Sequence, residues 1–154
     1  MQYLTYRELS EEEIERLIER MIDICKENDI KVTTQRILIF KELAKRTKEH
    51  PSVEEIYEAL KGKVYGLSLS TVYRSLNTFE RLGLVRRIPT PDGKAHFEIA
   101  NEPHGHFICQ NCGKIVDVDN LSLNNQIKEE IKKFGYAPFE CNFFCYGLCK
   151  DCTN

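Results

Sequence analysis

Residues 66–99 read GLSLSTVYRSLNTFERLGLVRRIPTPDGKAHFEI, and this stretch decides the fold of the first half of the chain. Ser68 is a favoured N-cap residue and Gly83 is placed as a C′ glycine, so a helix is predicted between them. The apolar period then becomes strand-like over 84–88 and 95–99, on either side of a Thr-Pro-Asp-Gly turn. The stretch therefore predicts a helix that leads directly into a β-hairpin.

Three further helices are predicted before this stretch. Capping boxes of the form Ser-x-x-Glu begin at Ser10 and Ser52, and Thr33 or Thr34 can cap a helix between them. Apolar residues recur at helical spacing after each cap. Helices followed by a terminal hairpin predict a winged helix-turn-helix domain over residues 1–100, with an additional helix at its N-terminus.

The helix predicted after Ser68 has two faces of different chemistry. One is a core stripe that consists of Leu69, Val72, Leu76 and Phe79. The other carries groups that can bond to phosphates or base edges, namely Ser70, Thr71, Tyr73, Arg74 and Asn77. A polar outer face is also ordinary for a solvated helix, but Arg86, Arg87 and Lys94 add positive charge on the hairpin, as a wing along a DNA backbone requires. Together these features favour double-stranded DNA as a partner.

The charge of the chain is segregated, although its net charge is only −2. Residues 1–29 carry 4 basic and 9 acidic side chains, whereas residues 30–100 carry 13 basic and 8 acidic ones. Within the second range, residues 61–100 hold seven basic side chains against three acidic ones. Such a stripe is either a solvated surface or the electrostatic footprint of a protein that binds phosphates.

The 154 residues contain no apolar run of the roughly 18 residues that a membrane span needs, and the N-terminus lacks the pattern of a signal peptide. We therefore expect a cytoplasmic protein with no membrane partner. Seven cysteines in a cytoplasmic chain favour metal ligation over a disulfide framework.

A second domain is predicted over residues 104–154, after a hinge at residues 101–103. Its expected elements are strands over 107–109, 114–118 and 139–146, and a helix over 121–134 that is closed by Gly135. This is a small α+β domain, so the fold class of the whole chain is α+β.

Two Cys-x-x-Cys knuckles begin and end this second domain. They are Cys109 with Cys112 and Cys149 with Cys152, and each can place two thiolates on one ion from a tight turn. Four sulfurs satisfy tetrahedral zinc, whereas a redox dithiol would need only one knuckle and a reducing compartment disfavours disulfides. The pattern favours structural zinc, held across the 36 residues between the knuckles.

A His-x-His pair, His104 and His106, lies just before the first knuckle. On an extended segment both imidazoles point to the same side, and the nearby carboxylates are Glu98, Glu102 and Asp117. Such a pair is either an exposed strand face or half of a mixed nitrogen and oxygen site, which would suit iron, manganese or zinc.

Three motifs closely resemble the ferric uptake regulator (Fur) family. They are HGHFICQNCGKIVD at 104–117, LSLSTVYRSL at 67–76 and TQR at 34–36. The resemblance extends from about residue 14 to Cys152. It implies a dimeric repressor with an N-terminal winged helix and a C-terminal dimerisation domain, in which metal loading sets the orientation of two DNA-reading heads.

The resemblance also implies roles for individual residues. A regulatory metal site that ties the two domains together falls on His50, Glu98, His104, His106 and Asp117. The structural zinc falls on Cys109, Cys112, Cys149 and Cys152, and the DNA-reading side chains are Tyr73 and Arg74. We expect further DNA contacts from Arg36, Ser70, Thr71, Asn77 and Lys94. Only the resemblance indicates His50, because spacing alone does not.

Two of the ligand positions resemble different branches of the family. Asp117 is typical of the peroxide-sensing branch, in which an iron-bound histidine is oxidised, whereas Glu98 resembles the iron-responsive pattern. Cys141 matches a histidine in a second metal site of some members, and is either a ligand that favours zinc or a core residue. Cys25 and Cys145 lie on apolar faces, where we expect them to pack.

We therefore expect a metal-dependent repressor that senses ferrous iron, binds a DNA operator as a homodimer, and carries structural zinc and regulatory Fe2+ or Mn2+. Peroxide sensing with iron or manganese, and zinc sensing, are alternatives within the family. A zinc-dependent enzyme is the rival from another class, but a closed four-cysteine site leaves no coordination position for catalysis. We predict neither a catalytic residue nor a small-molecule substrate.

Overall fold

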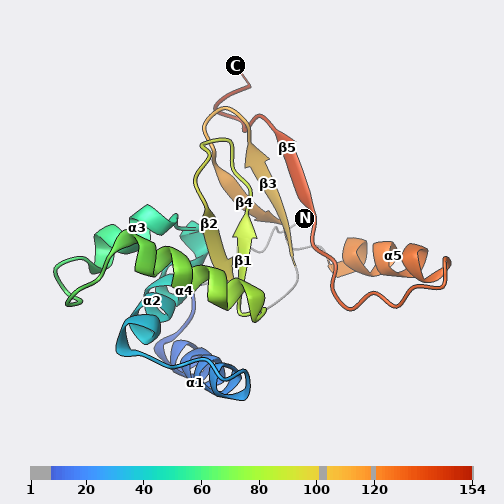
Figure 1. Ribbon diagram of the computed structural model, residues 1–154. Coiled ribbons are helices and arrows are strands. Elements are labelled where there is room, and N and C mark those ends of the chain that lie inside the picture. The colour runs from blue at the N-terminus through green and yellow to red at the C-terminus, as the bar shows by residue number, and fades with distance from the viewer. Residues whose placement is uncertain (1–7, 101–103, 119–120, 154) are drawn as a thin grey trace. The chain divides into compact units, whose positions relative to one another are not determined.

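The computed structural model describes residues 8–100, 104–118 and 121–153, which form two compact units (Figure 1). The first unit, which we call the reading unit, consists of residues 8–89 and 93–100, and the second, the zinc unit, contains the C-terminal residues. The predicted hinge at 101–103, with Glu102, lies outside the described residues, so the domain boundary stays a prediction.

The reading unit has the winged-helix element order that the sequence predicts. Its elements are α1 (Glu11–Glu27), α2 (Thr34–Lys45), the 3-10 turn η1 (Thr47–Glu49), α3 (Val53–Leu60), α4 (Leu69–Arg81), β1 (Val85–Ile88) and β2 (His96–Ile99). The two strands pair as an antiparallel hairpin, in which Arg86 lies opposite Glu98 and Arg87 opposite Phe97.

The predicted helix caps are confirmed. Ser10 and Ser52 each form a capping box with the glutamate three residues further on, and Thr33 rather than Thr34 caps α2. Ser68 caps α4, and Gly83 follows the helix with φ 71°, a left-handed conformation that favours glycine. Local sequence therefore fixes where each of these four helices begins.

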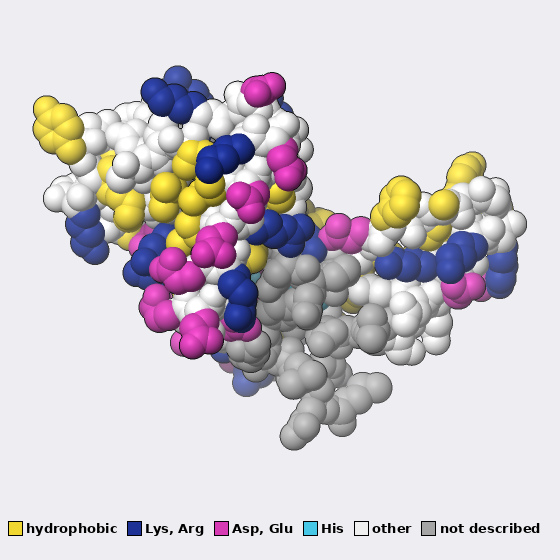
Figure 2. All heavy atoms as spheres, turned by 90° about the horizontal axis from the view of Figure 1, so that it is seen from below, with side chains coloured by type: hydrophobic (Ala, Val, Ile, Leu, Met, Phe, Trp, Pro, Cys, Tyr) yellow, Lys and Arg dark blue, Asp and Glu magenta, His cyan; other side chains and the backbone are white. Residues whose placement is uncertain are grey.

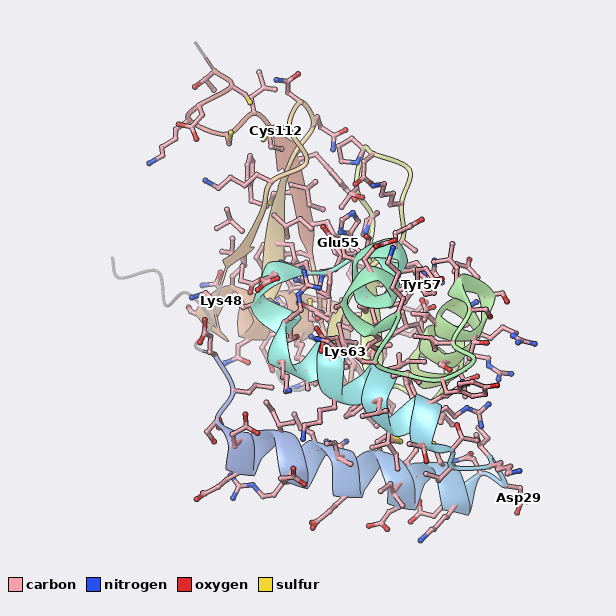
Figure 3. The ribbon with its side chains drawn as sticks, turned by 90° about the vertical axis from the view of Figure 1, so that its left-hand side faces the viewer. Asp29, Lys48, Glu55, Tyr57, Lys63 and Cys112 are labelled. Carbon is pink, nitrogen blue, oxygen red and sulfur yellow. The ribbon has the colours of Figure 1, made fainter. Side chains whose placement is uncertain are left out.

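The core of the reading unit lies among the helices and the hairpin. In Figure 3 α1 runs beside α2, and Asp29 marks the turn between them. The rings of Phe40 and Phe79 meet edge to face at 5.3 Å, and Phe97 from the hairpin is fully buried. The expected core position of Leu69 is wrong, because this first residue of α4 precedes the packed turns and is 43% exposed.

The zinc unit is built on a three-stranded sheet. Its elements are β3 (Gly105–Cys109), β4 (Ile115–Val118), α5 (Leu121–Lys132) and β5 (Phe144–Gly147), and the strand order is β4-β3-β5. Strand β4 runs antiparallel to β3, whereas β5 runs parallel to it. In Figure 1 α5 extends away from this sheet.

Two expectations for the zinc unit are wrong. The last strand begins at Phe144 and not at Phe139, because pairing with β3 begins where Phe144 lies opposite His106. Cys145, expected to pack, is exposed and lies on β5, an edge strand of the sheet. Within the described ranges, no helix has the length and apolar character needed to cross a bilayer.

Candidate metal centres and DNA-reading surface

The parallel pairing of β3 and β5 brings the two cysteine knuckles together. Cys109 ends β3 and lies opposite Gly147, so both knuckles leave the same edge of the sheet. Each knuckle is a tight turn, in which Gly113 N–H donates to the Cys109 carbonyl and Cys152 N–H to the Cys149 carbonyl. Sequence reasoning predicted the two knuckles, and the structure shows why 36 intervening residues do not separate them.

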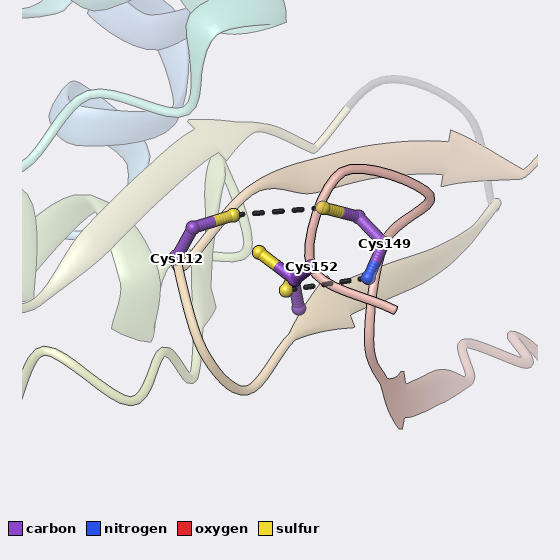
Figure 4. A group of neighbouring side chains, drawn as sticks. Cys112, Cys149 and Cys152 are labelled. Carbon is purple, nitrogen blue, oxygen red and sulfur yellow. Dashed lines mark hydrogen bonds between the residues drawn. The ribbon is translucent and has the colours of Figure 1, made fainter. Parts of the chain in front are cut away.

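The four sulfur atoms have the spacing of a tetrahedral zinc site. They lie within 4.8 Å of one another, and the Cys112 and Cys149 sulfurs are 3.8 Å apart (Figure 4). Zinc bound tetrahedrally with bonds of about 2.3 Å would separate its sulfur ligands by about 3.8 Å. The Cys112 and Cys149 sulfurs match this separation, and the four-cysteine group can hold a zinc ion.

Hydrogen bonds to sulfur complete this site. The N–H of Cys149 and the side-chain amide of Asn111 donate to the sulfurs of Cys109 and Cys152 respectively, each at 3.3 Å. Donation from the backbone N–H of Cys112, and then of Cys149, lowers the pKa of Cys109 to about 6. For Cys152 the Asn111 amide lowers the pKa, but the neighbouring thiols and desolvation outweigh it and raise the pKa to about 11. Cysteine binds zinc as the thiolate, so zinc binding at this site would release protons from the thiols.

The reading unit contributes a histidine and carboxylate pair. His50 follows η1 in a left-handed conformation, with φ 51°, and its Nε2 lies 3.4 Å from Glu98 Oε2 on β2. The other oxygen of Glu98 accepts a hydrogen bond from Arg86 across the hairpin at 3.3 Å. The His50 carbonyl accepts from His96 Nδ1 at 2.8 Å, which ties this turn to β2. His50 and Glu98 are both buried.

The zinc unit contributes a second set of donors. His104 and His106 alternate around Gly105, so both rings lie on one face of β3, and Asp117 on β4 lies directly opposite His106. The Nε2 atoms of both histidines lie 3.4 Å from the same Asp117 oxygen, Oδ1. The His106 ring also stacks on Phe144 at 5.4 Å, which holds its orientation.

The exposed face of α4 carries most of the predicted DNA-reading residues. Ser70, Tyr73 and Arg74 are exposed, and Tyr73 keeps 44% of its surface accessible. Thr71 is half-buried, and its hydroxyl bonds to that of the cap residue Ser68 at 2.8 Å. Lys94 is exposed on the segment that leads into β2.

A basic cavity of about 420 Å³ lies between α2 and α4. Its lining residues are Lys31, Thr33, Gln35, Arg36, Thr71, Arg74 and Ser75. The guanidinium of Arg36 donates to the Lys31 carbonyl, which holds the Arg36 side chain beside this cavity. Sequence reasoning included Arg36, Thr71 and Arg74 but missed Lys31, whose only signal is its position two residues before a helix cap.

Asn77 is partly engaged within the protein. Its side-chain oxygen accepts a hydrogen bond of 2.6 Å from Arg87 on β1, and its side chain is half-buried. Arg87 also bonds to Glu80, and this contact raises the pKa of the guanidinium. The sequence placed Arg87 on the wing but did not connect it to α4.

The remaining cysteines differ in their surroundings. Cys25 is buried against Met21, as expected of a packing residue, and burial raises the pKa of its thiol. Cys141 is half-buried and does not belong to the four-cysteine group.

The chain matches the family model of the ferric uptake regulator family over residues 27–146. It is 34% identical over 145 residues to the peroxide-responsive repressor PerR of Staphylococcus saprophyticus, covering 93% of this chain and 96% of that protein.

Solved structures agree with this similarity. The ferric uptake regulator of Helicobacter pylori, described as having three functional metal-binding sites, superposes with a TM-score of 0.77 at 30% identity and covers 100% of this chain and 98% of its own. The ferric uptake regulator of Pseudomonas aeruginosa with manganese gives a TM-score of 0.74 at 30% identity, covering 84% of this chain and 97% of its own.

Proposed function

The chain belongs to the ferric uptake regulator family, and we propose that it is a repressor that binds operator DNA as a cytoplasmic homodimer when a regulatory metal ion is bound. It is a transcriptional regulator rather than an enzyme. The following paragraphs give the residues that would hold each metal and the DNA.

Cys109, Cys112, Cys149 and Cys152 would hold the structural zinc ion. The sulfur spacing and the N–H donors to sulfur support this assignment. The ion would cross-link the knuckle at the end of β3 to the knuckle that follows β5. It would reinforce the parallel pairing of these two strands.

The observation that carries the regulatory proposal is the convergence of His104 and His106 on one oxygen of Asp117. Three donors leave coordination positions of a metal ion open. In the reading unit, His50 and Glu98 offer donors of the same two types, an imidazole and a carboxylate. We propose that one ion takes ligands from both sets. Imidazole and carboxylate donors suit ferrous iron or manganese, and iron is the proposed ion in the cell.

An ion that binds both units would supply a conformational constraint. It favours one arrangement of the reading units only by the difference in its affinity for that arrangement and for the others. Two reading units held in this way would fit successive major grooves of an operator.

For DNA, we propose that Tyr73 and Arg74 on α4 reach base edges and that Ser70, Thr71 and Asn77 lie beside them. Arg36, together with Lys31, would contact phosphates at the rim of the basic cavity. Lys94 would contact the backbone from the wing.

Exposed apolar side chains on the zinc unit support a homodimer. Phe134, Tyr136, Phe139 and Tyr146 keep 77%, 70%, 94% and 54% of their surface accessible. Figure 2 shows yellow hydrophobic side chains beside dark blue basic ones around α5. A second copy of the chain would cover such a patch.

Peroxide sensing is a second candidate. The relative from S. saprophyticus is peroxide-responsive, and Asp117 is the carboxylate at the convergent site. Iron-loaded protein exposed to dilute peroxide should then gain one oxygen atom on the tryptic peptide that holds His50 or His104. Peptides of unchanged mass would leave metal sensing as the function.

The main proposal is tested on protein purified without a chelator. Metal analysis should find about one zinc ion per chain that resists mild chelation. A random duplex DNA library is then selected with Fe2+ under anaerobic conditions, with Mn2+, with Zn2+ and without added metal. Enrichment of a two-fold symmetric sequence only with metal is expected, and equal enrichment without metal would contradict the proposal.

A further inference from the structure

We propose that Arg87 is a positioning residue for DNA reading, whose guanidinium holds Tyr73 in place on the exposed face of α4. This inference rests on the proposed function, because it assigns a role within the reading of DNA. It concerns only the reading unit, where Arg87 and its partners all lie.

Strand β1 directs two adjacent arginines to opposite sides of the hairpin. Arg86 bonds to Glu98, one of the proposed metal ligands. Arg87 lies opposite Phe97, and its side chain extends over the buried Phe97 ring with 4.9 Å between Cζ and the ring centroid. The side chains of neighbouring strand residues point to opposite faces. The Arg87 guanidinium therefore contacts α4, whereas the Arg86 guanidinium contacts the proposed metal ligand Glu98.

The guanidinium of Arg87 contacts three successive turns of α4. Its Cζ lies 5.9 Å from the centroid of the Tyr73 ring, within the range of a cation–π contact. Its Nη2 donates to Asn77 Oδ1 at 2.6 Å and to Glu80 Oε2 at 3.1 Å. These helix residues are spaced i, i+4 and i+7, which places them on one face. One planar group therefore links the wing to the helix that reads DNA.

The contacts favour positioning over direct contact with phosphate. Both Nε and Nη2 already bond to side chains of α4, and the carboxylate of Glu80 balances the positive charge. Without the guanidinium, the Tyr73 ring would lose its neighbour and Glu80 would present an unbalanced negative charge beside the DNA. A phosphate contact needs only a cation, whereas this arrangement needs the planar fork of arginine.

The test uses Arg87→Lys, which keeps the charge but removes the fork. In the full-length protein with Mn2+, the affinity for the selected operator should fall about tenfold, the scale of a lost cation–π contact and hydrogen bond. The affinity for random DNA and the salt dependence should not change. Arg81→Lys makes the same chemical change at an exposed position of α4 and serves as the matched control.

A double-mutant cycle with Tyr73→Ala separates positioning from a general structural effect. If Arg87 acts through Tyr73, Arg87→Lys should cost little further affinity in the Tyr73→Ala background. Glu80→Gln weakens the contact that holds the Arg87 guanidinium but keeps Arg87 itself. Its effect on operator affinity should likewise be small in the Tyr73→Ala background, and it replaces Arg87→Lys in the cycle if that variant does not fold.

Wild-type affinity in Arg87→Lys, or an equal loss with and without Tyr73, would overturn the inference while leaving the proposed function intact. A wild-type protein that selects no operator with any metal would instead overturn the proposed function, and the inference with it.

Discussion

At the scale of single residues, backbone N–H groups stabilise a thiolate at the proposed zinc site. Peptide N–H groups of Cys112 and Cys149 lower the pKa of Cys109 to about 6, which favours the thiolate form that binds a metal ion. The sequence pattern was sufficient to predict that these four cysteines form one group, because a Cys-x-x-Cys turn is a local feature.

We predict that Cys109→Ser abolishes zinc binding and unfolds the zinc unit. Structural zinc contributes roughly 10–16 kcal/mol in zinc-finger peptides, and losing one ligand forfeits much of this. Metal analysis and circular dichroism would measure both effects. Cys145→Ser, which changes an exposed thiol of the same unit, should keep its zinc. A folded, zinc-free Cys109→Ser protein would contradict the structural assignment.

Residues that act through distant neighbours could not be predicted in this way. His50 emerged only from the family resemblance, because its approach to Glu98 depends on a left-handed turn after η1. Arg87 was placed on a wing, yet its contacts with Asn77 and Glu80 depend on how the hairpin packs against α4. Tertiary packing, and not local pattern, sets both.

At the scale of elements, capping residues were sufficient to predict where the helices of the reading unit begin. The bounds of the strands depend instead on the strands with which they pair. Both capping boxes and the Ser68 cap are present because they satisfy N–H groups within their own turn. The start of β5 was placed five residues too early, since alternation alone cannot show where β3 is available for pairing. A strand is defined by hydrogen bonds to a neighbouring strand, whereas a helix cap bonds within its own segment.

Helix α4 and the hairpin of β1 and β2 should make separable contributions to DNA binding. Arg74→Ala on α4 should reduce the preference for the selected operator by about 1–3 kcal/mol if the side chain reads a guanine. Lys94→Ala should weaken binding to all sequences alike and lower the salt slope by about one. Titrations of operator and random DNA at several salt concentrations measure both. Equal losses on both DNAs for Arg74→Ala would make it a phosphate contact.

At the scale of the whole molecule, the proposed function requires two copies of the chain and a regulatory ion in each copy. The apolar side chains around α5 and β5 are exposed in the single chain, and the proposed regulatory ligands come as a pair, His50 with Glu98, and a separate group of three. Both features are accounted for if two copies associate and one ion joins the units within each copy.

The dimer can be tested on the zinc unit. Tyr146→Glu places a charge on the exposed face of β5, and we expect it to shift the protein from dimer to monomer in sedimentation experiments. Tyr65→Glu makes the same change at a fully exposed position of the reading unit and should stay dimeric. A dimeric Tyr146→Glu protein would show that another surface mediates association.

The central claim is that a regulatory ion acts as a conformational ligand, and titration of His104→Ala with Mn2+ against labelled operator tests it most directly. The variant should keep its fold, dimer and zinc, but its affinity for the operator should no longer rise with Mn2+, because one convergent donor is missing. Metal activation equal to that of the wild type would contradict the account, and would move the sensory site away from His104, His106 and Asp117.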